Sequence, residues 1–403
     1  MEKSRKPSID EDLSVISDFY DRFPFPGDPL KDEPPPGFNW RWSFDDVHSY
    51  CSGVLPCRDN SSETLRILDA GCGSGVSTDY LAHLNPSSEI LAVDISTGAL
   101  NVAIERLHRS GGDELASVHF ESRSLLDLDR EGPFDYINSV GVLHHLTDPL
   151  SGLKALSSLL KPGGILHLFI YASGGRWEIR RVQKALKSLR VVDDKDLLKL
   201  GREFFTNLPK NNRLKRNHEE RWAMECEFDV NFADMYLHPR ETTFNLERLW
   251  ELVDNSGLEF AEFSNPKVWS LERFLKGELL ERAKAMSHRQ QMILVEDLDP
   301  DISHFECFLS KGSIQKYEWK NDNDLLATTG KISRCIWGWP GKILHDSNMD
   351  RIELHRNSFK FLKTIENYPE MPFGLLPLEW GGSVTASTAR DLLQSQLLLL
   401  YPL

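Results

Sequence analysis

The residues with the clearest chemical potential lie in the run 64–75, which reads Thr-Leu-Arg-Ile-Leu-Asp-Ala-Gly-Cys-Gly-Ser-Gly. A short apolar stretch suited to a buried strand ends at Asp69, and Gly71, Gly73 and Gly75 follow at alternate positions. Glycine lets the backbone turn sharply and approach a ligand without a Cβ in the way. A helix is predicted directly afterwards, over about residues 76–84. The run therefore predicts a nucleotide-type site formed by a strand, a glycine turn and a helix N-terminus.

The spacing of the glycines discriminates between nucleotide ligands. The dinucleotide fingerprint G-x-G-x-x-G needs glycine at position 76, where this chain has Val76. The pattern is instead D-x-G-x-G-x-G, and an acid in front of the glycines suits a cationic ligand better than a pyrophosphate. A second apolar run ends at Asp94, where a carboxylate at a strand tip can accept hydrogen bonds from both hydroxyls of a ribose.

A second informative stretch covers residues 134–171. A predicted strand leads to a loop that carries adjacent histidines, His144 and His145. Asp148 is placed to cap a helix whose first turn contains proline. A Lys-Pro-Gly-Gly turn ends this helix, and a fifth strand is predicted to finish at Tyr171.

These two stretches resemble the class I S-adenosylmethionine-dependent methyltransferases, and residues 64–172 are closely similar to the ubiquinone- and menaquinone-type methylases. The resemblance implies an α/β fold with a doubly wound, mostly parallel seven-stranded sheet, helical insertions and a C-terminal appendage. It also implies S-adenosyl-L-methionine as cofactor and transfer of a methyl group to an acceptor. A different doubly wound nucleotide binder is the alternative interpretation of the glycine turn.

The resemblance further implies roles for individual residues in binding the cofactor. Backbone groups of the glycine turn hold the methionine portion, Asp69 orients its ammonium group, Asp94 binds the ribose, and Ile95 packs on the adenine. Ser124 stands where the family often has an acid that contacts the adenine amine, which leaves backbone contacts from this loop. The predicted cofactor contacts are Asp69, Gly71, Cys72, Gly73, Gly75, Asp94, Ile95, Ser124, Leu125 and Val140.

The acceptor must lose a proton if its reacting atom is a hydroxyl or a protonated amine, and imidazole titrates in the right range to take it. His145 and His144 are the candidate bases, and packing or loop capping is the alternative role for each of them. Tyr171 is a further candidate contact with the acceptor, and a structural role is the alternative for it. No group of His, Asp or Glu has a recognisable ligand spacing, so no metal site is predicted.

The chain of 403 residues is longer than one ordinary domain. Aromatic and proline residues indicate an extended N-terminal cap at 1–60, in which Tyr20 and Arg41 resemble family positions near the cofactor. The methyltransferase domain is predicted at 61–312, with helical insertions at about 175–228 and 266–303. Residues 313–403 are predicted to form an accessory region, in which the apolar residues between 389 and 400 favour a buried helix.

The net charge and the cysteine content of the chain indicate which binding partners and which cellular location to expect. A net charge of −14 disfavours general binding to nucleic acid, although residues 176–221 hold 14 Lys and Arg against 7 Asp and Glu. There is neither an apolar run of about 18 residues nor a secretory signal, so no membrane association is expected. The six cysteines are scattered without C-x-x-C spacing, which indicates reduced thiols and a cytoplasmic location.

Three functions are compatible with these patterns. The leading hypothesis is a methyltransferase for a small-molecule acceptor, methylated at oxygen, nitrogen or carbon, and the basic insertion would suit an anionic one. The alternative is a protein or tRNA acceptor docked by the basic insertion and the C-terminal region. The third is a non-catalytic binding protein, against which the intact Asp69, glycines and Asp94 argue.

Overall fold

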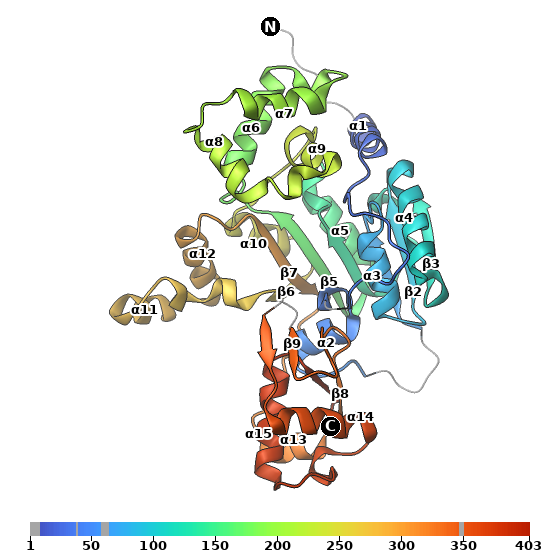
Figure 1. The fold of residues 1–403 in the computed structure, drawn as a ribbon, viewed down its shortest axis with the longest axis vertical. Coiled ribbons are helices and arrows are strands. Elements are labelled where there is room, and N and C mark those ends of the chain that lie inside the picture. Colours follow the sequence, from blue (N-terminus) through green and yellow to red (C-terminus); the bar gives the residue numbers. More distant parts are fainter. Residues whose placement is uncertain (1–8, 38, 58–63, 346–349) are drawn as a thin grey trace.

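A seven-stranded sheet forms the centre of the molecule in a computed structural model that describes residues 9–37, 39–57, 64–345 and 350–403 (Figure 1). Its strand order is β3-β2-β1-β4-β5-β7-β6, with parallel neighbours except for β7, which is antiparallel to β5 and β6. This confirms the predicted doubly wound sheet. The strands are β1 (Arg66–Ala70), β2 (Glu89–Asp94), β3 (Ser117–Ser122), β4 (Phe134–Val140), β5 (Leu160–Tyr171), β6 (Glu259–Phe263) and β7 (His304–Ser310).

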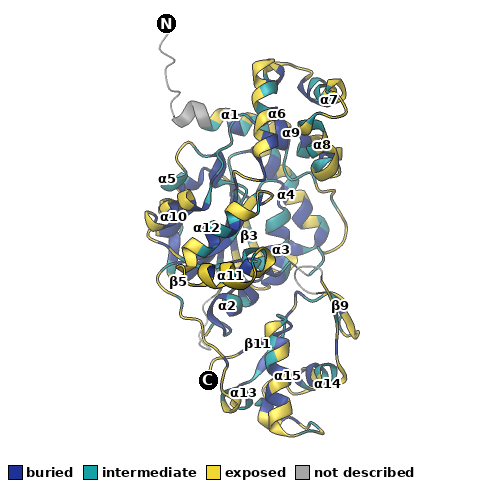
Figure 2. Ribbon diagram, turned by 90° about the vertical axis from the view of Figure 1, so that its left-hand side faces the viewer, coloured by how far each residue is buried: buried dark blue, intermediate teal, exposed yellow. Residues whose placement is uncertain are grey.

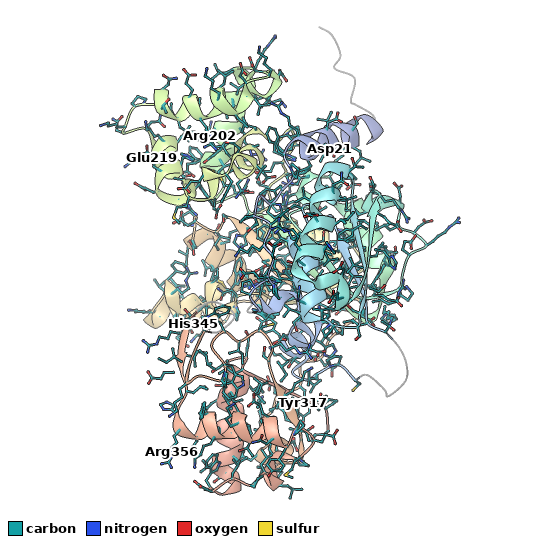
Figure 3. The ribbon with its side chains drawn as sticks, turned by 45° about the vertical axis from the view of Figure 1, so that its right-hand side comes forward. Asp21, Arg202, Glu219, Tyr317, His345 and Arg356 are labelled. Carbon is teal, nitrogen blue, oxygen red and sulfur yellow. The ribbon has the colours of Figure 1, made fainter. Side chains whose placement is uncertain are left out.

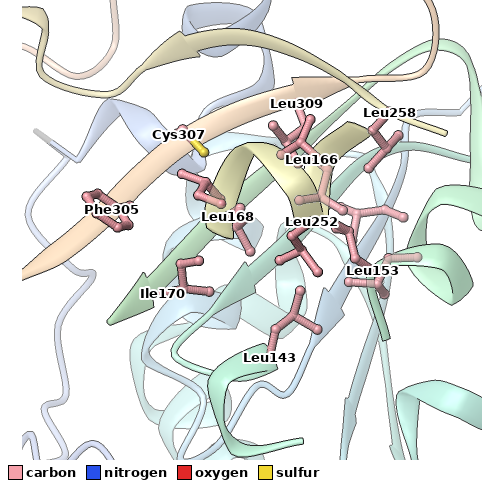
Figure 4. Packing of buried hydrophobic residues seen from close by; sticks show 14 of the residues in the cluster. Leu143, Leu153, Leu166, Leu168, Ile170, Leu252, Leu258, Phe305, Cys307 and Leu309 are labelled. Atoms are coloured by element: carbon pink, nitrogen blue, oxygen red, sulfur yellow. The ribbon is translucent and has the colours of Figure 1, made fainter. Parts of the chain in front are cut away.

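Helices cover both faces of this sheet, which is why its central strands are mostly apolar on both sides. On one face α5 (Pro149–Leu159) and α10 (Leu246–Asp254) pack on β4, β5 and β7. Figure 4 shows Leu153 of α5 and Leu252 of α10 beside Leu166 and Leu309 of the strands. The other face is covered by α3 (Val76–Leu84), α4 (Thr97–Ser110) and α2 (Phe44–Ser52). The N-cap predicted at Asp148 is present, because its side chain accepts hydrogen bonds from the first turn of α5.

The N-terminal segment contains more helix than its prolines and aromatics predict. Helix α1 (Ile9–Arg22) lies beside α4, and the Oδ1 atom of Asp21 accepts hydrogen bonds from Ser96 Oγ and Gly98 N at 2.7 and 2.8 Å (Figure 3). Helix α2 begins where the Ser43 side chain accepts a hydrogen bond from Asp46 N, and it ends at Gly53. The domain boundary predicted between residues 60 and 61 lies outside the described residues.

The first insertion forms a helical cap above the sheet, drawn at the top of Figure 1. The cap consists of α6 (Trp177–Ser188), α7 (Leu197–Asn207), α8 (Arg213–Asn217) and α9 (Asp229–Leu237), so it extends beyond the predicted limit at residue 228. It has its own apolar cluster, to which Phe23 of the N-terminal segment contributes. The second insertion contains α11 (Gly277–Lys284) and α12 (His288–Leu298), and Figure 2 shows that α11 is largely exposed.

The C-terminal region forms a separate layer with its own apolar cluster, drawn in red in Figure 1. The helix expected between residues 389 and 400 is only partly correct, because α15 ends at Gln394 and Leu398–Leu400 form a strand. Gln396 has a positive φ of 55°, which turns the chain out of the helix, and the three leucines then pair antiparallel with β8. The elements are α13 (Asp322–Ala327), β8 (Gly330–Ile332), β9 (Ile343–His345), β10 (Arg351–Glu353), α14 (Arg356–Asn367), α15 (Gly382–Gln394) and β11 (Leu398–Leu400).

This C-terminal region contacts α2 and the residues that follow it. Trp319 Nε1 donates to Gly53 O at 2.7 Å, Leu55 N donates to Leu400 O at 2.6 Å, and Ser333 Oγ donates to the buried carboxylate of Asp46. Helix α2 therefore connects the C-terminal region to the seven-stranded sheet. Among the helices of the described residues, none is both long and apolar enough to span a membrane.

A chain that ends at Gly312 should still bind the cofactor, because all seven sheet strands precede that residue. Its thermal unfolding temperature should fall, since the buried Asp46 would lose its hydrogen bond from Ser333 and the apolar cluster around Trp40 would lose Cys335. Calorimetry with S-adenosylhomocysteine, together with thermal unfolding, measures both effects. A soluble, folded truncation without cofactor affinity would contradict the predicted boundary, and so would a chain that cannot fold.

Candidate active site

A cavity of about 550 Å³ opens at the carboxyl ends of β1, β2, β4 and β5, beneath α1 and the helical cap. The carboxyl ends of parallel strands are where doubly wound folds bind ligands. Most of the predicted cofactor contacts line it, together with residues of the N-terminal segment and the cap. Those predicted residues are Gly71, Cys72, Gly73, Asp94, Ile95, Ser124, Leu125 and Val140, and the predicted acceptor contacts His145 and Tyr171 line it as well.

The glycine turn is held by the end of β2 and covered by the N-terminal segment. Gly71 and Gly73 have positive φ values of 83° and 53°, which side chains with a Cβ rarely adopt. A Cβ on Gly73 would lie 2.3 Å from the carbonyl oxygen of Phe25. The same oxygen accepts a hydrogen bond from Ser74 N at 2.9 Å. The absence of a side chain at position 73 thus allows the N-terminal segment to close over the turn.

Asp94 ends β2 and lines the cavity, as predicted. Its Oδ2 atom accepts a hydrogen bond from Gly73 N, and its Oδ1 atom accepts one from Ser96 N, both at 2.9 Å. Burial raises the pKa of this carboxyl, while the two backbone donors act to lower it. The side chain of Ser124 accepts a hydrogen bond from Leu126 N, so it caps its own turn. A ribose at Asp94 and backbone contacts from the Ser124 loop are compatible with this arrangement.

Two of the predicted cofactor contacts lie behind the cavity wall. Asp69 is fully buried, and its carboxylate accepts hydrogen bonds from Ser77 Oγ and Thr78 Oγ1, both at 2.7 Å. Gly75 faces Ala103 of α4, whose Cβ would lie 2.6 Å from an added Cβ. Since neither residue lines the cavity, Asp69 and Gly75 hold the turn and the start of α3 in place.

The cavity extends from Asp94 to a polar cluster that the cap supplies, centred on Asp234 of α9. Tyr20 donates its hydroxyl hydrogen to Asp234 Oδ1 at 2.9 Å, and Tyr171 donates to Asp234 Oδ2 at 3.4 Å. The Tyr20 oxygen lies 3.3 Å from His145 Nε2. Burial is the largest influence on both titratable partners, raising the pKa of Asp234 and lowering that of His145. This cluster can take up a proton from a bound acceptor.

Sequence reasoning missed Asp234, because it lies in an insertion without a recognisable motif. The one local signal is an acid within the stretch 232–237, where every other residue is apolar or aromatic and all are buried. Such an acid needs hydrogen-bond partners, which Tyr20 and Tyr171 provide from distant parts of the chain. Only the fold brings these three residues together.

The main-chain N–H and carbonyl groups of Arg240 set the tautomers of two neighbouring histidines. Its carbonyl oxygen accepts a hydrogen bond from His145 Nδ1 at 2.8 Å, while its N–H donates to His238 Nδ1 at 3.1 Å. In their neutral forms, His145 therefore has a bare Nε2 and His238 a protonated one. His145, Asp234 and His238 offer atoms within 4.8 Å of one another, a spacing that suits a metal. In this tautomer the Nε2 of His238 carries a hydrogen and is not in the form that binds a metal, and the absence of a metal site stays a prediction.

His144 does not share the position of His145. Its ring is fully buried outside the cavity lining and stacks on Tyr171 with 3.8 Å between ring centroids. Neither ring nitrogen has a hydrogen-bond partner among the described residues, and burial lowers the pKa of His144 well below its ordinary value. The packing role considered for this residue therefore fits the structure better than the catalytic one. Arg41 likewise lies outside the cavity lining and pairs with Glu306.

Comparisons with known proteins agree with this geometry. A family model described as a methyltransferase domain matches residues 68–166. An uncharacterized protein of Synechococcus sp. is 44% identical over 399 residues, which are 98% of this chain and 94% of that protein. The ubiquinone biosynthesis O-methyltransferase of Xanthomonas campestris pv. campestris is 35% identical over 103 residues, 26% of this chain and 41% of that protein.

Among solved structures, PKMT2 from Rickettsia typhi, also determined in complex with AdoHcy, has a similar fold. Its TM-score is 0.61 at 16% identity, and the match covers 91% of this chain and 77% of that one. Fold, site and comparisons together define a methyltransferase that uses S-adenosyl-L-methionine as its cofactor. The chain belongs to the class I S-adenosylmethionine-dependent methyltransferases.

Replacing Asp94 by alanine should weaken cofactor binding by about 1.5–3 kcal/mol, because hydrogen bonds to a charged acceptor are lost. Calorimetry with S-adenosylhomocysteine measures this change. Asp129→Ala is the matched control, since Asp129 is exposed and outside the cavity lining. Equal affinities in the two variants would contradict the assignment, as would measurable binding of NAD by the parent protein.

Proposed function

We propose that this enzyme transfers a methyl group to a proton-bearing oxygen or nitrogen of a small-molecule acceptor bound against Asp234. The observation that carries this proposal is a buried carboxylate at the cavity, held by two tyrosine hydroxyls beside His145. A buried acid with a shifted pKa in a cleft is a frequent mark of proton-transfer chemistry. Asp69 lies behind the cavity wall and supports the cofactor turn. Asp234 lines the cavity itself and can therefore contact the acceptor.

The protein's main contribution to this reaction is alignment in a dry site. S-adenosyl-L-methionine supplies an electrophilic methyl group on a positively charged sulfur. Because that charge disappears during transfer, the enzyme has to hold the acceptor in line and exclude water. Leu13, Ile16 and Tyr20 of α1 and Met235 of α9 line the cavity and close it from the side of the cap.

The proton released by the acceptor would pass to the Asp234 cluster. The carboxylate of Asp234 accepts it, after which the protonated carboxyl can donate to the Tyr20 oxygen and the Tyr20 hydroxyl can turn to donate to the bare Nε2 of His145. One proton can then reside on either residue, so the two titrate as a pair. Tyr171 completes the cluster by donating to the second oxygen of Asp234.

Charges around the cavity favour a neutral or cationic acceptor over the anionic one that the basic insertion suggested. Arg176 lines the cavity, but its guanidinium donates to both carboxylate oxygens of Glu241 at 3.0 and 2.6 Å. Arg180 donates to the backbone oxygen of Glu241 and does not line the cavity. The acids Asp234 and Glu225 line the cavity, and the positive charge of Arg176 that acts on both of them is already paired with Glu241.

A protein acceptor is the second candidate, and one surface feature favours it. Met224 and Phe228 are 84% and 51% exposed, and they flank Glu225, which lines the cavity. Exposed apolar side chains at the edge of a site are common where another macromolecule docks. Incubating cell extract with methyl-labelled cofactor separates the candidates, because the label would enter either the metabolite fraction or the protein fraction.

Replacing Asp234 by asparagine should lower kcat by about 10²–10⁴-fold, the usual contribution of a positioned base. The pH dependence should change as well. The parent gains activity as pH rises, because the Asp234–His145 pair must release a proton to act as a base. In the variant, the negative charge of Asp234, which acts to raise the pKa of His145, is absent. The pH at which activity falls on acidification, now set by His145 alone, should therefore be lower.

Asp229→Asn provides the control for this variant, because Asp229 lies on the same helix and is exposed. It should retain the parent's kcat and pH profile. Unchanged kcat in Asp234→Asn would overturn the proposed proton acceptor. Since cofactor binding depends on the other end of the cavity, both variants should bind S-adenosylhomocysteine as the parent does.

Reversing the charge of Arg180, Arg181 and Lys184 to glutamate tests the discarded anionic acceptor. These side chains are exposed and lie outside the cavity lining, so the acceptor KM should change by no more than about twofold. Steady-state kinetics at two salt concentrations measure this. A large rise in KM at low salt that disappears at high salt would show that the basic face of α6 attracts the acceptor.

A further inference from the structure

A row of hydrogen-bonded polar side chains crosses the sheet behind the cofactor turn. Asp69 of β1 pairs in register with Asn138 of β4, and Asn138 pairs with His167 of β5. Side chains at such opposite positions lie on the same face of neighbouring strands and can contact each other. The row continues to Glu306 of β7 and from there to Arg41 of the N-terminal segment. Asp69, Asn138 and His167 are each no more than 1% exposed.

The orientation of the Asn138 amide is fixed by two partners of known type. Trp42 Nε1, which can only donate, lies 3.1 Å from the atom assigned as Asn138 Oδ1. On the other side, Asn138 Nδ2 donates to Asp69 Oδ1 at 2.8 Å. The reverse orientation would place the amide nitrogen of Asn138 against the donor Trp42 Nε1 and its oxygen against the carboxylate of Asp69. The oxygen of Asn138 therefore faces His167.

His167 is consequently bound to acceptors at both ring nitrogens. Its Nδ1 lies 2.8 Å from Asn138 Oδ1, and its Nε2 lies 3.2 Å from Glu306 Oε1. Glu306 also accepts hydrogen bonds from Arg41 Nε at 2.7 Å and from Ser264 Oγ. Burial acts to raise the pKa of Glu306, but the hydrogen bond from His167 and the charge of Arg41 outweigh it and hold that pKa well below its usual range. With an amide oxygen at one nitrogen and a carboxylate at the other, each nitrogen needs a hydrogen.

We propose that His167 is an imidazolium cation at neutral pH and acts as a positioning residue for the cofactor site. The charges along the row then alternate as Asp69 negative, His167 positive, Glu306 negative and Arg41 positive. A buried charge is tolerated when opposite charges and hydrogen bonds compensate it, and each member of this row is compensated.

The row reaches the cofactor cavity through two residues of its wall. Ser77 lines the cavity and donates to Asp69 Oδ2, and Trp42 lines it and donates to Asn138 Oδ1. Asp69 also accepts from Thr78, so its carboxylate orientation fixes the first turn of α3. Burial raises the pKa of Asp69, while its three hydrogen-bond donors and the positive charge of His167 act to lower it. The hydrogen on His167 Nδ1 also binds the Asn138 oxygen, so the cation supports both partners that hold these wall residues in place.

The charge state can be measured directly in the unmodified protein. In nitrogen-15 spectra of histidine-labelled enzyme at pH 7.5, both ring nitrogens of His167 should carry a bonded hydrogen and resonate close together. His167→Gln identifies the signal by its loss. A neutral ring would show one bare nitrogen far downfield of the other, and this result for His167 would overturn the proposal.

Cofactor affinity tests the positioning role. His167→Gln should bind S-adenosylhomocysteine about tenfold more weakly by calorimetry, since an interaction with a buried charge is removed. His119→Gln, an exposed position on β3, should bind as the parent does. Unchanged affinity in a folded His167→Gln protein would overturn the positioning role. Because the readout is cofactor binding, the result does not depend on the proposed acceptor chemistry. If the variant fails to fold, the His167 ring can be assigned in the parent through its bonds to its own backbone, so the charge state is still tested.

Discussion

The hydrogen bond between Gly73 N–H and Asp94 is the interaction on which the site depends. It joins the ends of two adjacent parallel strands, and the neighbouring Gly71 and Cys72 N–H groups both donate to Val93 O at 2.8 and 3.0 Å. The glycine turn therefore folds across the end of β2 and does not project into solvent. This bend needs positive φ values, which glycine provides. It places the start of α3, the carboxylate of Asp94 and the covering N-terminal segment around one cavity.

The parts of the structure that the sequence predicted well are those specified by neighbouring residues. Glycines at fixed spacing after a short apolar run predict a strand followed by a tight turn. Asp148, which stands before a proline, caps the start of a helix as expected. Asp94 and His145 were predicted because each belongs to a motif that spans a strand end and its loop. His144 could not be distinguished from His145 in this way, because adjacent residues share the same local pattern and only the packing on Tyr171 separates them.

The remaining features depend on contacts between distant segments. Asp234 acquires its role from Tyr20 and Tyr171, which lie 214 and 63 residues away in the chain. The run Leu398–Leu400 has the composition of a buried helix, yet it forms a strand because β8 offers an unpaired edge beside it. His167 is one polar residue in an apolar strand, and its charge follows only from the partners on the neighbouring strands.

We propose that one cavity binds the cofactor at Asp94 and presents its sulfur to the Asp234 cluster. A crystal structure of the enzyme with S-adenosylhomocysteine tests this most directly. In that crystal structure the ribose hydroxyls should lie at Asp94, and the sulfur should face the space bounded by Tyr20, Tyr171 and Asp234. A sulfur that faces away from Asp234, with this cluster closed off from the ligand, would contradict it.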